Sequence, residues 1–303
     1  MYDVIIIGSG PAGLTAAIYS KRAMLNVIVA EKDYMGTGQI SVTERVDNYP
    51  GLYGINGFDL GEKFRDHATQ SGAEFYEGQA VSITRNKDIW NVEFADGSTL
   101  SAKAVIYAAG TSYRRLEVKG GDKQRISYCV VCDGAFYKGK TVAVIGGGDT
   151  ALGDALYLSK IAEKVYIIHR RDEFRGNKSL QAQVLAAGNV EPIMCATVAE
   201  VKGDTKAEAI VINQNGDLRE IAVDGIFCAM GSVPNSDLLK GVCNLDNSGY
   251  IKADEDCKTS ELGLFAAGDV RTTPLRQVIT AAADGANAAV SAEKYISGLV
   301  FGK

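Results

Sequence analysis

Short apolar runs alternate with glycine-rich turns and amphipathic stretches along this chain. Residues 2–7 and 141–145 are both rich in Val and Ile, and each run leads directly into a glycine-rich turn. Runs of this length with few polar positions are typical of strands that are buried on both faces of a parallel sheet. After each turn apolar residues recur at helical spacing, and a further apolar run follows. The pattern therefore predicts two strand–helix–strand units.

The first glycine-rich turn carries a dinucleotide-binding fingerprint. It reads Gly8-Ser9-Gly10-Pro11-Ala12-Gly13 and precedes a helix predicted over 14–23. The first glycine allows a tight turn, the second lets the backbone approach a pyrophosphate, and the third lets the helix pack on the strand. The helix N-terminus then offers free N–H groups to the phosphates.

An acidic residue completes this first unit. A strand is predicted over 26–30, and Glu31 follows it, 23 residues after Gly8. An acid near this position binds the ribose hydroxyls in dinucleotide-binding folds. We therefore expect a dinucleotide with a free 2′-hydroxyl in the first unit; the alternative is a glycine-rich turn without a ligand.

The second unit repeats the pattern with a different charge at its end. Its turn reads Gly146-Gly147-Gly148-Asp149-Thr150-Ala151, with a helix predicted over 151–161 and a strand over 164–168. The strand ends in His169-Arg170-Arg171, with Arg175 one turn later, and His169 stands 23 residues after Gly146. Arginines in place of an acid remove the repulsion of a 2′-phosphate and donate bidentate hydrogen bonds to it. The second unit therefore suits NADP; the alternative is a solvated run of surface charges.

Two hairpins and three glycine-terminated strands extend the duplication. The hairpins are predicted around the turns Asp96-Gly97 and Asn215-Gly216, and apolar strands ending in glycine follow at 104–110 and 225–231. A third such strand, 263–268, has no glycine-rich unit of its own, so it must complete one of the two domains. A helix predicted over 278–296 closes the chain.

This order predicts an α/β fold with two Rossmann-like, three-layer ββα dinucleotide-binding domains, the second inserted in the first. We expect residues 1–113 and 246–303 to form the FAD-binding domain and residues 114–245 to form the NADPH-binding domain with the cysteine pair. The alternative is two consecutive domains followed by a C-terminal appendage. The length of 303 residues suits two domains.

Composition and charge exclude several classes of protein. Hydrophobic residues make up 46% and charged residues 23% of the chain, which is ordinary for a globular protein. The net charge of −5 without a block of like charges does not fit a nucleic-acid-binding protein. No apolar run approaches the ~18 residues of a membrane span, and the N-terminus lacks the pattern of a signal peptide. We therefore expect a cytoplasmic protein whose cysteines lie in a reducing compartment.

The pair Cys129-Val130-Val131-Cys132 lies between the two fingerprints. A zinc site needs about four ligands, whereas the other four cysteines are isolated and the only histidines are His67 and His169. A structural disulfide that closes so short a loop would add little stability. A redox-active dithiol fits best, with Asp133 as a general acid or, alternatively, as a simple cap or turn residue. We expect Cys195, Cys228 and Cys243 to be buried small hydrophobic residues.

The two nucleotide sites and the dithiol form an electron path. NADPH carries two electrons as hydride but does not easily reduce a disulfide directly. A flavin accepts hydride and passes the electron pair to sulfur, so we expect FAD in the first site.

Together these motifs resemble the low-molecular-weight, bacterial-type thioredoxin reductases of the class II pyridine nucleotide-disulfide oxidoreductases. The match runs from end to end of the chain. It rests on Gly8–Gly13, Gly38-Gln39, Asn48-Tyr49-Pro50-Gly51, Ala108–Thr111, Cys129–Gly134, Gly146–Ala151, His169–Arg171 with Arg175, Gly268-Asp269-Val270 and Arg276-Gln277.

The resemblance implies an NADPH-dependent thioredoxin-disulfide reductase that is a homodimer and has thioredoxin as its partner. It implies that Cys132 is the sulfur next to the flavin, that Cys129 attacks the partner disulfide, and that Asp133 is the general acid. The residues implied to bind FAD are Gly8, Ser9, Gly10, Pro11, Ala12, Gly13, Glu31, Gly38, Gln39, Asn48, Val81, Ala109, Gly110, Asp269, Arg276, Gln277 and Val278. Those implied to bind NADPH are Gly146, Gly148, Asp149, Thr150, Ala151, His169, Arg170, Arg171 and Arg175.

Two positions depart from the pattern of the family. Gly153 replaces the first of two acids on the second fingerprint helix, and Thr37 interrupts the glycines before Gln39. Family members with altered NADPH motifs take electrons from ferredoxin, so Gly153 keeps ferredoxin open as the alternative donor. A non-catalytic flavin redox sensor is a third reading.

The position of the dithiol implies a domain movement. The dithiol and the NADPH fingerprint lie in the same inserted domain, yet both must reach one flavin ring. We expect the insert to rotate about its two connections, at 111–117 and 245–249.

Overall fold

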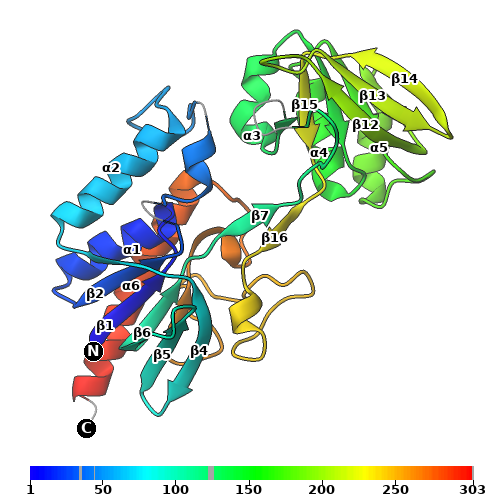
Figure 1. Ribbon diagram of the computed structural model, residues 1–303. Helices are drawn as coiled ribbons and strands as arrows, with labels where there is room; N and C mark the ends of the chain where they lie inside the picture. Colours follow the sequence, from blue (N-terminus) through cyan, green and yellow to red (C-terminus); the bar gives the residue numbers. More distant parts are fainter. Residues whose placement is uncertain (34–35, 44, 122–125, 302–303) are drawn as a thin grey trace. The chain divides into compact units, whose positions relative to one another are not determined.

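The computed structural model describes residues 1–33, 36–43, 45–121 and 126–301. It contains two compact units, of which unit 1 comprises Met1–Ser112 and Val233–Lys303 and unit 2 comprises Tyr113–Ser232 (Figure 1). Unit 2 is thus inserted in unit 1. Each unit holds a mainly parallel sheet with covered faces, so the expected α/β fold class is confirmed.

Unit 1 is built on a seven-stranded sheet in the order β3-β2-β1-β6-β5-β4, with β17 paired to β6. Its central strands are parallel, and β5 joins them antiparallel. The strands are β1 (Tyr2–Ile7), β2 (Val27–Glu31), β3 (Glu74–Glu77), β4 (Ala80–Asn86), β5 (Ile89–Phe94), β6 (Thr99–Tyr107) and β17 (Leu264–Ala266). The third glycine-terminated strand therefore completes the first domain, as the sequence required.

Three helices cover one face of this sheet (Figure 1). They are α1 (Pro11–Arg22), α2 (Gly57–Gln70) and α6 (Val278–Phe301), and the short turns η1 (Gln39–Val42) and η4 (Gly268–Val270) lie in the same unit. Helix α6 packs closely on α1, because a Cβ atom added to Gly285 would lie 3.0 Å from the backbone nitrogen of Ala16. On the other face of the sheet, Trp90 of the hairpin is 1% exposed and belongs to a second apolar cluster.

Unit 2 repeats this plan with a five-stranded parallel sheet in the order β11-β10-β9-β15-β8. Helix packing covers one face, and a three-stranded antiparallel sheet in the order β12-β13-β14 covers the other. The parallel strands are β8 (Ile126–Ser127), β9 (Thr141–Ile145), β10 (Lys164–Ile168), β11 (Val190–Ile193) and β15 (Gly225–Cys228). The antiparallel strands are β12 (Ala196–Lys202), β13 (Ala209–Gln214) and β14 (Asp217–Ala222), and the helices are α3 (Val130–Asp133), η2 (Gly134–Tyr137), α4 (Asp149–Ser159) and α5 (Lys178–Ala186).

The chain passes between the units through two paired strands, β7 (Thr111–Tyr113) and β16 (Ser232–Pro234). The first domain boundary lies where the sequence placed it, within one residue. The second lies at Val233 rather than at residue 246. The reason is packing: Leu239, in η3 (Asp237–Leu239), is fully buried in the apolar cluster of unit 1.

The predicted second connection at 245–249 is therefore wrong. These residues lie within unit 1, where the Asp246 carboxylate accepts hydrogen bonds from the backbone N–H groups of Ser248 (2.8 Å) and Tyr250 (2.9 Å). The alternative of two consecutive domains with an appendage is also wrong, because β17 and α6 complete the first unit.

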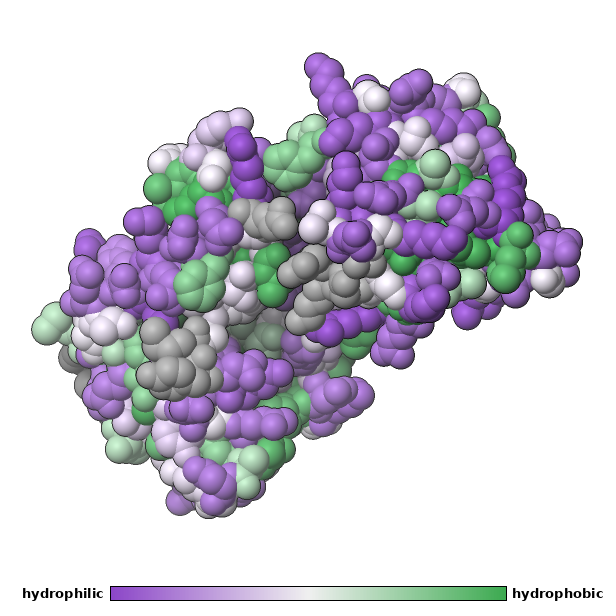
Figure 2. Space-filling view, turned by 45° about the horizontal axis from the view of Figure 1, so that its top comes forward, coloured by the Kyte–Doolittle hydropathy of each residue, from purple (hydrophilic) through white to green (hydrophobic). Residues whose placement is uncertain are grey.

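The face of the molecule seen in Figure 2 is mainly hydrophilic. Figure 2 shows polar side chains over most of the visible face, with apolar residues in scattered positions between them. Among the residues that the structure describes, no helix is both long enough and apolar enough to cross a membrane.

Candidate active site

The fingerprint of unit 1 has the geometry that its glycines predict. Gly8 has φ +101°, and a Cβ atom there would lie 2.8 Å from the carbonyl carbon of Ala108. A Cβ atom at Gly13 would come within 3.0 Å of the carbonyl carbon of Gly8. At Gly10, the N-cap residue of α1, a Cβ atom would meet nothing nearer than 3.9 Å. Two glycines thus serve close packing, and the middle one leaves the helix N-terminus open to a ligand.

Glu31 ends β2 and lies against this turn. Its Oε2 accepts hydrogen bonds from the backbone N–H of Ser9 (3.0 Å) and from Ser9 Oγ (2.9 Å). The N–H of Lys32 donates to Oε1 at 2.8 Å. The fingerprint and the acid, 22 residues apart at Ser9 and Glu31, are therefore brought together as expected.

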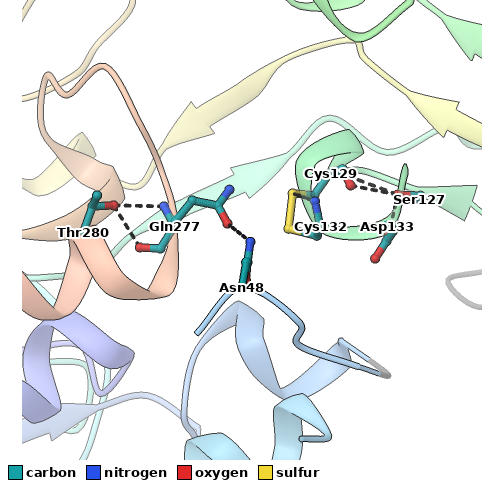
Figure 3. Close-up of a disulfide and its surroundings, with 7 residues drawn as sticks. All are labelled: Asn48, Ser127, Cys129, Cys132, Asp133, Gln277 and Thr280. Carbon is teal, nitrogen blue, oxygen red and sulfur yellow. Dashed lines mark hydrogen bonds between the residues drawn. A yellow bond between two sulfur atoms is a disulfide. The ribbon is translucent and has the colours of Figure 1, made fainter. Parts of the chain in front are cut away.

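Two amide side chains of the expected FAD set also meet. Asn48 Nδ2 donates to Gln277 Oε1 at 2.9 Å, and the N–H of Gln277 donates to Thr280 Oγ1 at 3.0 Å at the start of α6 (Figure 3). Gln39 takes a different partner, because its Nε2 donates to the carbonyl oxygen and to Oγ1 of Thr111. These pairings were not predicted from the sequence.

Asp269 lies in the η4 turn, immediately after Gly268 with φ +75°. Burial raises the pKa of its carboxyl group to about 6, although the charge of Arg276 acts in the opposite direction. Arg276 donates from Nε to the Asp269 carbonyl oxygen (3.4 Å), and its guanidinium group lies 4.1 Å from the ring centre of Tyr250. Val81 lies apart from these groups as an exposed residue at an irregularity of β4.

Two groups in unit 1 support the expected residues and were not singled out from the sequence. Asn235 holds the 109–112 segment, because its Nδ2 donates to the Ala109 carbonyl oxygen (2.8 Å) and its N–H to that of Gly110 (3.0 Å). Asp284 of α6 accepts hydrogen bonds from Gly268 N–H (3.1 Å) and Arg271 Nε (2.9 Å). Neither belongs to a recognisable motif, and no signal in the sequence marks either of them.

The fingerprint of unit 2 has the same design. Gly146 has φ +152°, and a Cβ atom there would lie 3.1 Å from the carbonyl carbon of Ala229. Gly148 is the N-cap residue of α4, and a Cβ atom there would meet nothing within 4 Å. Ala151 is fully buried in the position of the third glycine. The carboxylate of Asp149 accepts a hydrogen bond from the N–H of Asn177 at 2.6 Å.

His169 and the arginines after it differ in their surroundings. His169 is 6% exposed, stacks on Phe174, and lies so close to Gly147 that a Cβ atom there would be 2.6 Å from its ring carbon Cγ. Burial, together with the neighbouring arginine charges, lowers its pKa. Its Nε2 is buried and has no hydrogen-bond partner among the described residues. His169 is thus a neutral group beneath the fingerprint loop rather than part of the charged surface.

Arg170, Arg171 and Arg175 are all exposed. Their loop returns to the fingerprint, because the N–H groups of Arg175 (2.8 Å) and Gly176 (3.2 Å) both donate to the carbonyl oxygen of Gly147. The guanidinium groups and the open N-terminus of α4 therefore belong to one local surface of unit 2.

The cysteine pair forms a disulfide at the N-terminus of α3, with Cα atoms 5.2 Å apart (Figure 3). The Sγ atom of Cys129 accepts a hydrogen bond from the N–H of Cys132 at 3.2 Å. Ser127, at the end of β8, donates from Oγ to Asp133 Oδ2 at 2.5 Å. The three residues expected to carry the chemistry thus share one short segment, with Ser127 as an additional partner.

The other cysteines lie apart from this pair. Cys228 and Cys257 are buried and Cys243 is partly buried, and burial raises the pKa of the Cys228 and Cys243 thiols to about 11. Cys195 is exposed, contrary to the expectation, and has φ +53° at the turn that follows β11. No group of three or more potential metal ligands occurs in the part of the chain that the structure describes.

The two departures from the family pattern have clear local structures. A Cβ atom at Gly153 would meet nothing within 4 Å, so the missing acid leaves open space on α4. The next residue, Asp154, is largely buried, which raises the pKa of its carboxyl group to about 7. Thr37 is 3% exposed and packs against Gly61 of α2.

Comparison with known proteins agrees with this arrangement. Residues 2–285 match the family described as pyridine nucleotide-disulphide oxidoreductase. Two curated proteins named thioredoxin reductase are similar over 99% of this chain: that of Listeria monocytogenes is 42% identical with 95% of its length covered, and that of Bacillus subtilis is 40% identical with 96% covered. A solved structure of thioredoxin reductase from Streptococcus pyogenes has a TM-score of 0.94 and 38% identity, covering 98% of this chain and 99% of that one. This chain belongs to the pyridine nucleotide-disulphide oxidoreductase family, and within it to the thioredoxin reductases of the bacterial type.

Proposed function

We propose that this protein reduces the disulfide of thioredoxin with electrons from NADPH, through FAD and the Cys129–Cys132 pair. The observation that carries the proposal is a disulfide in the same unit as a fingerprint whose strand ends in exposed arginines. A second fingerprint, with an acid at the matching position, lies in the other unit. The names of the similar proteins support the same activity.

The residues present fit both cofactors. The open approach at Gly10 and the acid Glu31 suit the pyrophosphate and ribose of FAD. The open N-terminus of α4 at Gly148 and the exposed Arg170 and Arg171 suit the pyrophosphate and 2′-phosphate of NADPH. When bound, FAD accepts hydride from NADPH and supplies the electron pair that reduces the disulfide.

The chain's own residues carry the thiol chemistry. In the disulfide form the N–H of Cys132 donates to Cys129 Sγ, and the same donor would stabilise a Cys129 thiolate after reduction, which favours Cys129 as the attacking sulfur. Its bond to thioredoxin forms as the thioredoxin disulfide breaks, and Asp133 gives its proton to the departing thiolate. The Asp133 carboxylate then takes the proton of Cys132, and the Cys132 sulfur attacks Cys129 Sγ. The mixed disulfide breaks as the Cys129–Cys132 disulfide re-forms, and the departing thioredoxin thiolate takes that proton from Asp133, so thioredoxin leaves as a dithiol.

Anaerobic mixing with NADPH tests the proposal. We expect the flavin absorbance to bleach rapidly, and subsequent addition of oxidised thioredoxin to restore it in steady turnover. Bleaching only by reduced ferredoxin or light would favour the ferredoxin-dependent alternative. Bleaching without turnover of any thioredoxin would favour a redox sensor.

A homodimer and a rotation of the inserted unit are further parts of the proposal. The dimer rests on the resemblance to the family, and light scattering of the purified holoprotein tests it. The rotation rests on the presence of the dithiol and the NADPH fingerprint in the same unit. Because β7 and β16 are the covalent connections, we place the pivot there instead of at 245–249.

A further inference from the structure

We propose that Ser127 is a positioning residue that holds the Asp133 carboxyl group for proton transfer to the departing thiolate. The inference rests on the proposed function, in which Asp133 is the general acid. It concerns a residue that belongs to neither fingerprint and lies two positions before Cys129.

Ser127 is fixed by the sheet of unit 2. It ends β8, which pairs with β15 so that Ser127 stands opposite Phe227 and Ile126 opposite Ile226. Ile126 is 4% and Phe227 1% exposed, so the strand end is anchored in the core. A side chain at this place has a defined position relative to the loop that follows.

One hydroxyl group joins the acid to the attacking cysteine. Ser127 Oγ donates to Asp133 Oδ2 at 2.5 Å and accepts a hydrogen bond from the N–H of Cys129 at 3.3 Å. The carbonyl oxygen of Cys129 lies 3.5 Å from the same Oγ. The hydroxyl therefore links the two ends of the segment 127–133, which contains the disulfide (Figure 3).

A hydroxyl can serve both protonation states of Asp133. It has one donor hydrogen and two acceptor lone pairs. Toward the carboxylate it donates its hydrogen, as the structure shows. Toward the carboxylic acid it accepts the acid's hydrogen and turns its own hydrogen to the Cys129 carbonyl oxygen. Asp133 can thus release and regain a proton without losing its partner, which keeps it in place throughout the cycle.

Four variants of the holoprotein test this role. Ser127→Ala removes the hydroxyl. Ser127→Thr keeps it and Ser127→Val removes it, and these two matched side chains have nearly equal volumes and both suit a strand. Ser159→Ala, which removes another half-buried hydroxyl of unit 2, is the control. The measurements are the pH profile of kcat for thioredoxin reduction and the rate of flavin bleaching by NADPH.

We expect kcat at neutral pH to fall about tenfold in Ser127→Ala and Ser127→Val. Complete removal of a general acid costs more than this, but in these variants Asp133 itself is still present. The alkaline limb of the profile should move to higher pH, because the carboxylate loses a hydrogen-bond donor. Ser127→Thr should have the wild-type kcat and the wild-type pH profile. The rate of flavin bleaching by NADPH should be the same in all the variants. In an Asp133→Asn background, removal of the hydroxyl should have no further effect.

Different outcomes overturn different claims. A wild-type protein that does not turn over thioredoxin contradicts the proposed function itself. An Asp133→Asn variant with full activity contradicts the role of Asp133 as general acid, and with it the role of Ser127. A normal wild type with an unaltered profile in Ser127→Ala and Ser127→Val contradicts the role of Ser127 alone. A fall in kcat that also occurs in Ser127→Thr contradicts the role of Ser127 as well. The same holds for a fall in kcat that persists in the Asp133→Asn background.

Discussion

Thr37 and Gly61 are complementary: the threonine side chain fills the space that a side chain at position 61 would need. A Cβ atom added to Gly61 would lie 2.7 Å from Thr37 Cβ, and Thr37 is 3% exposed. The position that interrupts the usual glycines before Gln39 is therefore accommodated by a glycine in the middle of α2. The threonine at position 37 therefore requires the glycine at position 61.

Gly61→Ala should destabilise the protein despite the higher helix propensity of alanine. The added methyl group must displace Thr37, and overpacking of this kind costs about 1–3 kcal/mol. Denaturant unfolding measures the loss, and Thr37→Gly in the same chain should recover most of it. A stabilised single variant would contradict this account of α2.

Gly153→Ala should have the opposite effect on α4. Its Cβ would meet nothing within 4 Å, so only the helix propensity changes, which favours alanine by about 1 kcal/mol. We expect higher stability in the same unfolding experiment and an unchanged KM for NADPH. A large rise in that KM would mean that the open space over Gly153 is needed by the nucleotide.

Replacement of Arg170 and Arg171 by alanine should remove the preference for NADPH. Each charge-assisted hydrogen bond to the 2′-phosphate contributes about 1.5–3 kcal/mol, so KM for NADPH should rise at least about tenfold. KM for NADH should change little, and Arg219→Ala, which removes an exposed arginine of β14, should leave both unchanged. Steady-state kinetics with the two nucleotides decide it; an equal loss with both would argue against this assignment.

The two cysteines should differ in their ability to trap thioredoxin. Cys132→Ser leaves Cys129 without a resolving thiol, so a mixed disulfide with thioredoxin should accumulate. Cys129→Ser should form none. Mass spectrometry of each variant, mixed with thioredoxin lacking its own resolving cysteine, gives the result. An adduct formed only through Cys132 would reverse the two roles.

Asp154 should make the stability of the protein depend on pH. Burial raises the pKa of its carboxyl group from 3.8 to about 7, so between these values the folded protein binds more protons than the unfolded chain. Stability must then fall as the pH rises through this window, by about 4 kcal/mol in total, and stay low above it. Asp154→Asn should remove this part of the decline in unfolding experiments between pH 4 and 8. An Asp172→Asn control at an exposed site should keep the wild-type slope, and an Asp154→Asn variant with that slope would contradict the prediction.

The elements that the sequence predicted best are those whose signal is local. The strands Tyr2–Ile7, Thr141–Ile145 and Lys164–Ile168 have the predicted bounds, because continuous apolar runs fix strands that are buried on both faces. Helix α1 begins three residues earlier than predicted, at Pro11, since proline suits the first helical turn. The first and third fingerprint glycines, Gly8 and Gly13, also have the predicted turn and packing roles, because each role follows from the absence of a side chain.

The features that the sequence did not predict depend on contacts between distant segments. The return to unit 1 at Val233 depends on the pairing of β16 with β7 and on the burial of Leu239, neither of which has a local signal. Two further features are local but also lacked a signal in the sequence. Cys195 is exposed at a bend with φ +53°. The hydrogen bond between Ser127 and Asp133 joins residues whose spacing alone is ordinary.

The late position of β17 and α6 in the chain governs the order in which the protein can assemble on the ribosome. All of unit 2 has been synthesised once Ser232 is made, whereas α1 lacks its neighbour until residues 278–301 emerge. The domain that is begun first is therefore the last to be finished, and the apolar face of α1 stays uncovered while the insert folds. Nascent chains halted before Leu264 should consequently be the form most open to proteolysis and aggregation, with a folded insert between two incomplete halves of unit 1.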